Sequence, residues 1–343
     1  MRSLVLLNLE DNPEFEGLEL QLFDDEVKGK GAAAIMWHTD KRGDFYVTPG
    51  VTLDIDKIEV SGGVGEIITQ DFHYKLDINS YGVDAHVSLT LKDGRPVDFW
   101  LSEKRPKVRK PLTILAPVGG VTSNPGYFPV FHLQDIDLVQ RQDSNYSFKI
   151  ADNNYHPPKI PVPMPYSGKL VYFLRYCSDP VMGLLNMQYD GELTALKPEH
   201  NVIFKHRNTS YIFKNREGYF EIQKVSVVDN EHNLYITFSP TIPDIVNLKD
   251  GVSIRGRFDI GVDDTSDLIQ GVYQIRREEK SISMEMYPDR NWKPRGSLLQ
   301  RLTLFCFPPE FRTWIKTYHW KATIQEEAKH GRVTMKSGWQ RTT

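Results

Sequence analysis

Three titratable side chains in this sequence stand where a β protein could use them for proton transfer. His38 and Asp40 follow the apolar run Ala32–Met36, and Tyr189 lies at a polar turn in the second half of the chain. Each of these groups can donate or accept a proton when it is shielded from water and held against a substrate. We therefore predict His38, Asp40 and Tyr189 as catalytic residues.

Aromatic and polar residues gather near the same inferred strands and turns. A small-molecule site is usually an apolar cavity that holds a few placed polar groups. We predict a ligand-binding role for Trp37, Arg175, Tyr176, Asp190 and Trp292. The same residue types also form the core and rim of ordinary β domains, and this simpler interpretation stays open for each of them.

Several strong catalytic signatures are absent from the chain. It has no Gly-x-Ser-x-Gly, Gly-x-x-x-x-Gly-Lys, His-Glu-x-x-His or Cys-x-x-Cys motif. Gly29-x-Gly31-x-x-Ala34 fits a dinucleotide fingerprint only loosely, because no helical pattern follows it. His200 and His206 do not have the spacing of a known metal site. We predict that the protein uses no cofactor and no metal.

The elements that must position these residues read as β-strands. Leu18–Leu22 alternates apolar and polar residues, and Phe72–Ile78 and Val83–Leu91 form the pattern of an antiparallel hairpin. Further strand patterns follow from residue 170 to residue 286, at a spacing of about 8 to 12 residues that is typical of a sandwich or barrel. Residues 308–325 read as a short helix that runs into a strand. We predict an all-β protein, mainly antiparallel, with a few short helices.

A proline-rich stretch divides the chain. Residues 157–165 hold five prolines, which remove backbone donors and favour an extended spacer. A chain of 343 residues suits two domains. We predict an N-terminal β domain at 1–160 and a C-terminal lipocalin-like β domain at 161–343.

Composition limits the partners. The net charge of −3 and the pI near 6.4 argue against nucleic-acid binding. The sequence has no run of about 18 apolar residues, so we expect no integral membrane association. The basic stretch Ser102–Pro111 reads as a solvated loop, with an anion site as the alternative. Cys177 and Cys306 read as reduced core thiols, so we expect a soluble, cytoplasmic protein. The sequence leaves the oligomeric state open.

The opening residues carry a resemblance to a known group. Phe15–Asp24 followed by Gly31–Ile35 resembles the start of two-domain calycin proteins, a group that includes AttH-type proteins, carotenoid hydratases, tocopherol-cyclase-like proteins and fungal Diels–Alderases. The resemblance implies a lipocalin-like C-terminal domain and an apolar ligand. It also implies acid–base help to an isomerisation, hydration or cyclisation without metal or nucleotide. It assigns no catalytic residue.

These observations leave three functions open. The first is an enzyme that binds an apolar or amphipathic small molecule in a β-domain pocket and catalyses one of those cofactor-free reactions. The second is a carrier that only holds such a molecule. The third is a carbohydrate-binding β-sandwich, for which Trp100, Trp292 or Trp339 would be an exposed stacking platform.

Overall fold

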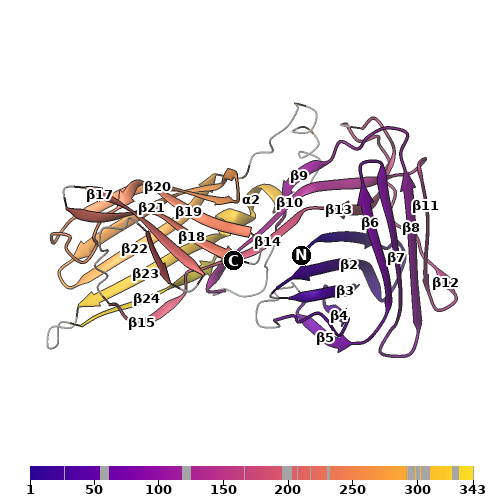
Figure 1. Ribbon diagram of the computed structural model, residues 1–343, viewed down its shortest axis with the longest axis horizontal. Coiled ribbons are helices and arrows are strands. Elements are labelled where there is room, and N and C mark those ends of the chain that lie inside the picture. The colour runs from indigo at the N-terminus through magenta and orange to yellow at the C-terminus, as the bar shows by residue number, and fades with distance from the viewer. Residues whose placement is uncertain are drawn as a thin grey trace. The chain divides into compact units, whose positions relative to one another are not determined.

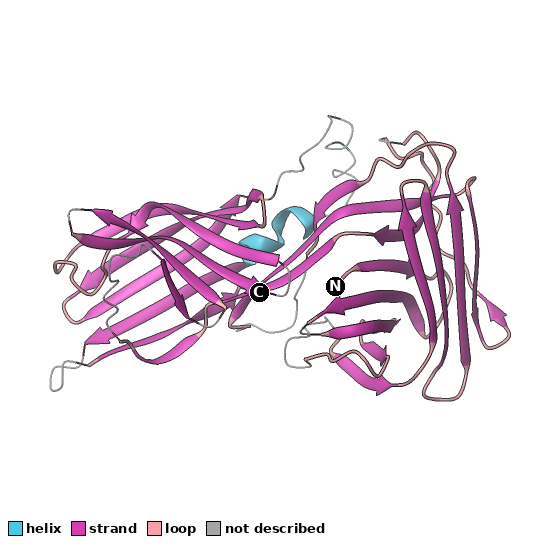
Figure 2. Ribbon diagram, viewed as in Figure 1, coloured by secondary structure: helices cyan, strands magenta, loops and turns pink. Residues whose placement is uncertain are grey.

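The fold is taken from a computed structural model, in which strands dominate the chain (Figure 2). Two short helical turns, α2 (Glu310–Thr313) and η2 (Trp314–Thr317), lead into strand β23 (Tyr318–Glu326). The all-β prediction is therefore confirmed. No helix in the described part of the chain is long and apolar enough to cross a membrane. The structure describes residues 1–26, 28–54, 62–117, 125–165, 167–194, 203–206, 208–216, 218–229, 232–290, 292, 298, 302, 310–326 and 332–342.

The chain divides into two compact units, neither of which is a continuous piece of sequence. The first unit contains Met1–Val121, Phe131–Met182 and Pro294–Phe307. The second contains Thr122–Val130, Gly183–Lys293 and Pro308–Thr343. The proline-rich stretch around residue 160, which we expected between two domains, lies within the first unit.

Two sheets build the first unit, although residues 127–130 of β10 and 183–186 of β14 fall in the second (Figure 1). The nine-stranded sheet has the order β14 (Pro180–Asn186), β10 (Tyr127–Gln140), β13 (Val171–Cys177), β1 (Ser3–Asn8), β2 (Phe15–Asp25), β3 (Gly29–His38), β4 (Gly43–Val47), β5 (Val64–Thr69), with β9 (Leu112–Leu115) paired to β10. The five-stranded sheet has the order β12 (Asn153–Asn154), β11 (Ser144–Ile150), β8 (Pro96–Lys104), β7 (Gly82–Thr90), β6 (His73–Asn79). β4 and β5 pair in parallel.

One hydrophobic core joins these two sheets. Alternate residues of each strand point into it, as the period of two in a strand requires. The predicted hairpin is confirmed as β6 and β7, which pair from His73↔Ser88 to Asn79↔Gly82. Cys177 is a free, buried thiol, as predicted, whereas Cys306 lies outside the described residues. Core members include Val5, Leu7, Leu18, Leu20, Ala34, Leu174 and Tyr176 from one sheet and Val83, Ala85, Val87, Phe99, Leu101 and Phe148 from the other.

The second unit is built on one ten-stranded antiparallel sheet. Its order runs from one edge strand to another and does not close within the described residues. Tyr318, Trp320, Ala322 and Ile324 alternate as buried residues along β23, which confirms the predicted strand. The order is β15 (Tyr189–Glu192), β24 (Val333–Arg341), β23, β22 (Ser281–Arg290), β21 (Thr265–Glu278), β20 (Ser253–Val262), β19 (His232–Ile242), β18 (Tyr219–Asp229), β17 (Thr209–Arg216), β16 (Ile203–His206).

Candidate functional site

The predicted catalytic residues lie in different places. His38 ends β3 in the first unit, and Asp40 lies in the turn that follows, exposed to solvent. Asp40 Oδ1 accepts a hydrogen bond from the Arg42 N–H at 3.0 Å. Tyr189 begins β15 in the second unit, is 40% exposed, and donates its hydroxyl to the Glu192 carbonyl at 2.6 Å. His38 and Asp40 therefore belong to the first unit and Tyr189 to the second.

His38 pairs with Asp44 instead of Asp40. The His38 Nε2–Asp44 Oδ2 distance is 2.9 Å, and both residues are buried. Burial alone would raise the pKa of Asp44, but hydrogen bonds from His38 and from the Glu66 N–H, together with the charge of Lys92, lower it overall. Lys92 Nζ lies 3.3 Å from Asp44 Oδ2 and follows β7 in sequence. The Asp44–Lys92 ion pair therefore connects the β3–β4 hairpin to the five-stranded sheet.

Trp37 and Arg175 lie on the same face of the nine-stranded sheet, the one that points away from the core, and both interact with Glu19. Along β3 and β13 the core takes Met36 and Tyr176, so the adjacent Trp37 and Arg175 point to the opposite side. Arg175 of β13 stands opposite Leu6 of β1, Leu6 stands opposite Glu19 of β2, and Glu19 stands opposite Ile35 of β3. These four residues therefore form one row across the sheet. We call this surface the Glu19 face; its members are Leu6, Asn8, Glu19, Gln21, Ile35, Trp37, Phe45, Phe173 and Arg175.

Glu19 is the buried acid of this face. The residue is 6% exposed. Its Oε1 accepts from Gln21 Nε2 at 2.6 Å and its Oε2 accepts from the Trp37 indole N–H at 3.2 Å. Burial raises the pKa of Glu19, although these two hydrogen bonds and the charge of Arg175 oppose the rise. The carboxyl group is thus oriented by neutral donors and titrates above the usual range of a glutamate.

Arg175 supplies the positive charge. Its guanidinium donates to Asn8 Oδ1 and lies 4.3 Å from the centre of the Phe173 ring. Burial lowers the pKa of Arg175 to about 10, although the charge of Glu19 raises it. The group stays protonated at neutral pH, and its buried Nε has no hydrogen-bond partner among the described residues. Its Nε–H is thus a buried hydrogen-bond donor that the described residues leave unused.

Aromatic and aliphatic side chains surround these polar groups. The Trp37 indole lies across Gly43, where a Cβ would stand 3.1 Å from the ring. Phe45 meets the indole edge to face at a centroid distance of 6.3 Å. Ile35 and Phe45 are buried, whereas Leu6, Trp37 and Phe173 keep part of their surface exposed. A largely apolar surface with one acid and one guanidinium suits an apolar or amphipathic molecule that carries an oxygen function.

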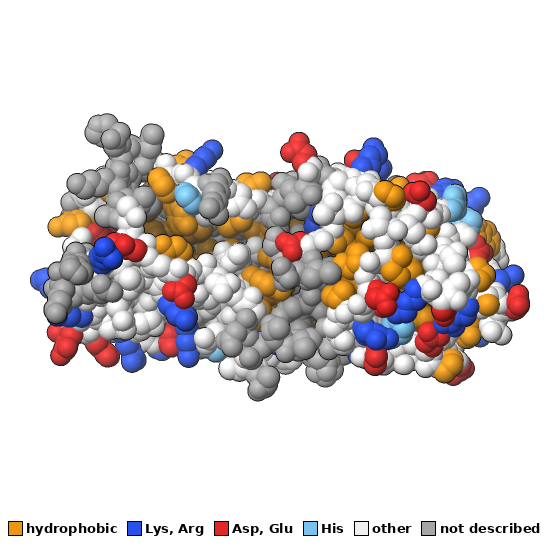
Figure 3. Space-filling view, turned by 90° about the horizontal axis from the view of Figure 1, so that it is seen from below, with side chains coloured by type: hydrophobic (Ala, Val, Ile, Leu, Met, Phe, Trp, Pro, Cys, Tyr) orange, Lys and Arg blue, Asp and Glu red, His pale blue; other side chains and the backbone are white. Residues whose placement is uncertain are grey.

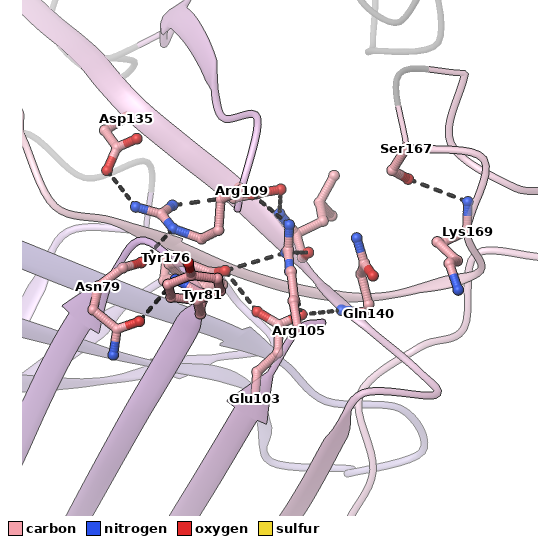
Figure 4. A network of polar contacts seen from close by, with 12 residues as sticks. Asn79, Tyr81, Glu103, Arg105, Arg109, Asp135, Gln140, Ser167, Lys169 and Tyr176 are labelled. Atoms are coloured by element: carbon pink, nitrogen blue, oxygen red, sulfur yellow. Dashed lines mark hydrogen bonds and ion pairs between the residues drawn. The ribbon is translucent and has the colours of Figure 1, made fainter. Parts of the chain in front are cut away.

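Tyr176 belongs to a different cluster, on the core side of β13 (Figure 4). Its hydroxyl donates to Glu103 Oε2 at 2.6 Å and accepts from the Arg105 guanidinium at 3.1 Å. Arg105 also lies 2.8 Å from Asp137 Oδ2. Burial raises the pKa of both Tyr176 and Glu103. Since Tyr176 is 0% exposed, this network has no access for a substrate and acts as a structural connection.

The same cluster corrects the prediction for Ser102–Pro111. We expected a solvated basic loop, and Lys104, Lys107 and Lys110 are indeed exposed, but the Arg105 and Arg109 side chains are only 4% and 7% exposed. Arg109 donates to Asp135 Oδ2 at 2.6 Å, and its guanidinium lies 5.2 Å from the centre of the Tyr176 ring. Both arginines are therefore neutralised inside the first unit.

The remaining predicted residues lie in the second unit. Asp190 pairs with Lys336 at 3.6 Å on the surface, and Trp292 is half-buried. Trp339, which the carbohydrate-binding alternative offered as a possible exposed platform, is only 1% exposed, and its ring centre lies 4.9 Å from that of Phe128. His200 lies outside the described residues. Within the described part of the chain, no group of three or more His, Cys, Asp or Glu side chains could hold a metal ion.

No protein-family model, no curated protein and no solved structure matches this chain. The functional argument therefore rests on the residues of the Glu19 face and their geometry.

Proposed function

We propose that the first unit binds an apolar or amphipathic small molecule at the Glu19 face and uses Glu19 to transfer a proton. The observation that carries this proposal is the Glu19 carboxyl group, buried, raised in pKa and held by Trp37 and Gln21 beside a half-buried arginine. Perturbed titratable groups of this kind are concentrated at functional sites.

The arrangement assigns a role to each group. A glutamate whose pKa is shifted toward neutral pH can both give and take a proton. The free Nε–H of Arg175 can stabilise negative charge that develops on an oxygen atom of the substrate. Trp37, Phe45 and Phe173 can hold the apolar part in a productive orientation. The supported reactions are isomerisation, hydration or cyclisation without a cofactor, and the resemblance to two-domain calycins points to the same class.

Carriage without catalysis uses the same face and is the second candidate. Glu19 and Arg175 would then only hydrogen-bond the ligand. The two functions differ in the effect of replacing Glu19 by glutamine. An enzyme would lose turnover, whereas a carrier would still bind its ligand.

The first test is native mass spectrometry of the purified protein, followed by solvent extraction and identification of any bound molecule. We expect an apolar or amphipathic compound. The compound then serves as the substrate for Glu19→Gln, which keeps the shape of the side chain. We expect turnover to fall by about 10²–10⁴-fold with little change in affinity. Glu66→Gln, which removes a carboxylate from a half-exposed site on β5, is the matched control and should keep full turnover.

The pH profile separates the roles. If Glu19 is the acid, kcat/KM falls as the pH rises through its raised pKa, and if it is the base, kcat/KM rises over the same range. Glu19→Gln removes that ionisation from the profile. Wild-type turnover in Glu19→Gln would reject proton transfer and leave carriage. A protein that stays free of ligand after incubation with lipid and isoprenoid mixtures would reject both.

A further inference from the structure

The outward face of the five-stranded sheet has an exposed tryptophan at its centre. β8 is the middle strand of the order β12-β11-β8-β7-β6, and Trp100 is the fifth of its nine residues. Its neighbours in sequence, Phe99 and Leu101, are fully buried in the core, so Trp100 points away from it. Trp100 is 39% exposed. Part of the indole surface is therefore exposed to water and is not covered by packing within the unit.

Polar side chains surround this indole on every side. In the register, His86 of β7 stands opposite Trp100 on one side and Ser147 of β11 on the other. The other large apolar residues of β7, β8 and β11 belong to the core or pack against it, as do Leu76 and Ile78 of β6. The outward positions that flank Trp100, which together with it we call the Trp100 face, are His73, Lys75, Asp77, Asp84, His86, Ser88, Asp98, Ser102, Asn145, Ser147 and Lys149.

Contacts within the face hold several of these groups in place. His86 Nε2 lies 3.1 Å from Asp98 Oδ1, and the His73 ring packs against His86 at a centroid distance of 4.6 Å. Lys75 Nζ donates to Asp84 Oδ2 at 2.6 Å. Donors and acceptors are therefore presented at fixed positions around a flat ring, which lowers the entropy lost on binding a polar ligand.

The charges of the face exclude strongly charged partners. Lys75 and Lys149 stand among Asp77, Asp84 and Asp98, so both signs are present. On the side of the first unit that Figure 3 shows, at the right, red and blue atoms are likewise interspersed. A polyanion or an acidic lipid surface needs a basic patch. An apolar molecule would remove water from these polar groups without replacing their hydrogen bonds.

We infer that the Trp100 face binds a neutral carbohydrate chain. The C–H face of a sugar ring can stack on the flat indole, while its hydroxyl groups exchange hydrogen bonds with His86, Ser147, Asp98 and their neighbours. An open sheet face gives a chain-like ligand room to extend along the strands. This site is separate from the Glu19 face and does not depend on the function proposed there.

The test is affinity electrophoresis of the full-length protein in native gels that contain one soluble neutral polysaccharide each: hydroxyethylcellulose, xylan, galactomannan or glycogen. We expect at least one of them to retard the wild-type protein. Trp100→Ala should weaken the binding by about tenfold or more, the effect of removing a central aromatic anchor. His86→Ala should weaken it less. Tyr219→Ala, which removes an aromatic residue that is 66% exposed in the second unit, should migrate like the wild type.

The same gels contain the controls. Glu19→Gln should keep the retardation, which separates this inference from the proposed enzyme. Unchanged circular dichroism and melting temperature show that Trp100→Ala and His86→Ala are folded; if Trp100→Ala is not, His86→Ala alone decides. Absence of retardation in all four gels overturns the inference, as does equal retardation of the folded variants and the wild type. Two further gels contain heparin or polyglutamate; retardation in these alone would show a charged partner and would also overturn the inference.

Discussion

Arg175 and Tyr176 are neighbours in sequence, but they lie on opposite faces of β13 and in different environments. Tyr176 is enclosed with Glu103, Arg105 and Asp137, where each charged group has an opposite partner or a hydrogen-bond donor. A buried network of this type is strongly destabilised when one member is lost, because the remaining groups stay buried without their partners. The network therefore connects β8, β10 and β13 and does not need a ligand.

Tyr176→Phe tests this role. The substitution removes the hydroxyl group that donates to Glu103 and accepts from Arg105. We expect a loss of about 1–3 kcal/mol in the free energy of unfolding, because two buried polar groups each lose a partner. Thermal denaturation should show a melting temperature several degrees lower. Tyr146→Phe is the control, since its hydroxyl bonds the exposed His156 and Tyr172 and its loss leaves no buried charge without a partner, so it should cost less than Tyr176→Phe. Equal losses in the two variants would contradict the structural role.

At the residue scale, the sequence drew attention to Trp37 and Arg175, which share the Glu19 face, but not to the acid between them. Glu19 lies in the alternating run Leu18–Leu22, and such a pattern predicts that the charged positions face water. The strand is in fact buried on both faces, with Leu18 and Leu20 in the core and Glu19 on the other side. Asp44 was missed for a related reason: its partner His38 is six residues away across a hairpin, and sequence spacing does not show that the two side chains meet.

Paired glycines and aromatics organise the centre of the second unit at the scale of its strands. Phe258 of β20 stands opposite Gly271 of β21, and Gly256 of β20 stands opposite Tyr273 of β21. Each ring lies across the glycine of the other strand. A Cβ added to Gly271 would be 2.3 Å from the Phe258 ring, and a Cβ added to Gly256 would be 2.5 Å from the Tyr273 ring. Both aromatic residues are fully buried. The two strands thus gain a close contact that any larger residue would prevent.

Gly271→Ala should therefore destabilise the second unit. Its Cβ would overlap the Phe258 ring and the Tyr287 carbonyl oxygen, each at 2.3 Å. Overpacking of this kind costs about 1–3 kcal/mol, which urea denaturation followed by circular dichroism can measure. Gly338→Ala on β24 is the matched control, because its nearest neighbours would be 3.7 Å away. A Gly271→Ala variant as stable as Gly338→Ala would show that the rings move aside without cost.

The strands themselves were the most predictable elements. Alternation located the β6–β7 hairpin and β23, because one buried face leaves a clear period of two. It could not give the strand order. β1 pairs with β13, so Leu6 meets Arg175 across a gap in sequence that no local pattern spans. The Glu19 face is made by that pairing, which explains why its polar members could not be grouped from the sequence.

The division of the whole molecule also depends on β13. Local proline content suggested a boundary at residue 160, since prolines mark extended spacers. The chain beyond the prolines returns to the first unit, where β13 lies between β10 and β1 in the nine-stranded sheet. Leu174 and Tyr176 of β13 belong to the core of that unit. A sequence boundary placed before β13 therefore separates a central strand from its sheet.

Two shortened chains test this arrangement. Residues 1–160 lack β13, so the edges of β10 and β1 lose their partner and the core loses two buried side chains. Residues 1–186 keep β13 and β14, and both chains lack residues 294–307, so the comparison isolates these strands. We expect 1–160 to aggregate or to show no cooperative thermal transition by circular dichroism, and 1–186 to keep β structure that melts cooperatively. A cooperative transition in 1–160 would show that the first unit folds without β13, and the domain boundary would then lie at the prolines.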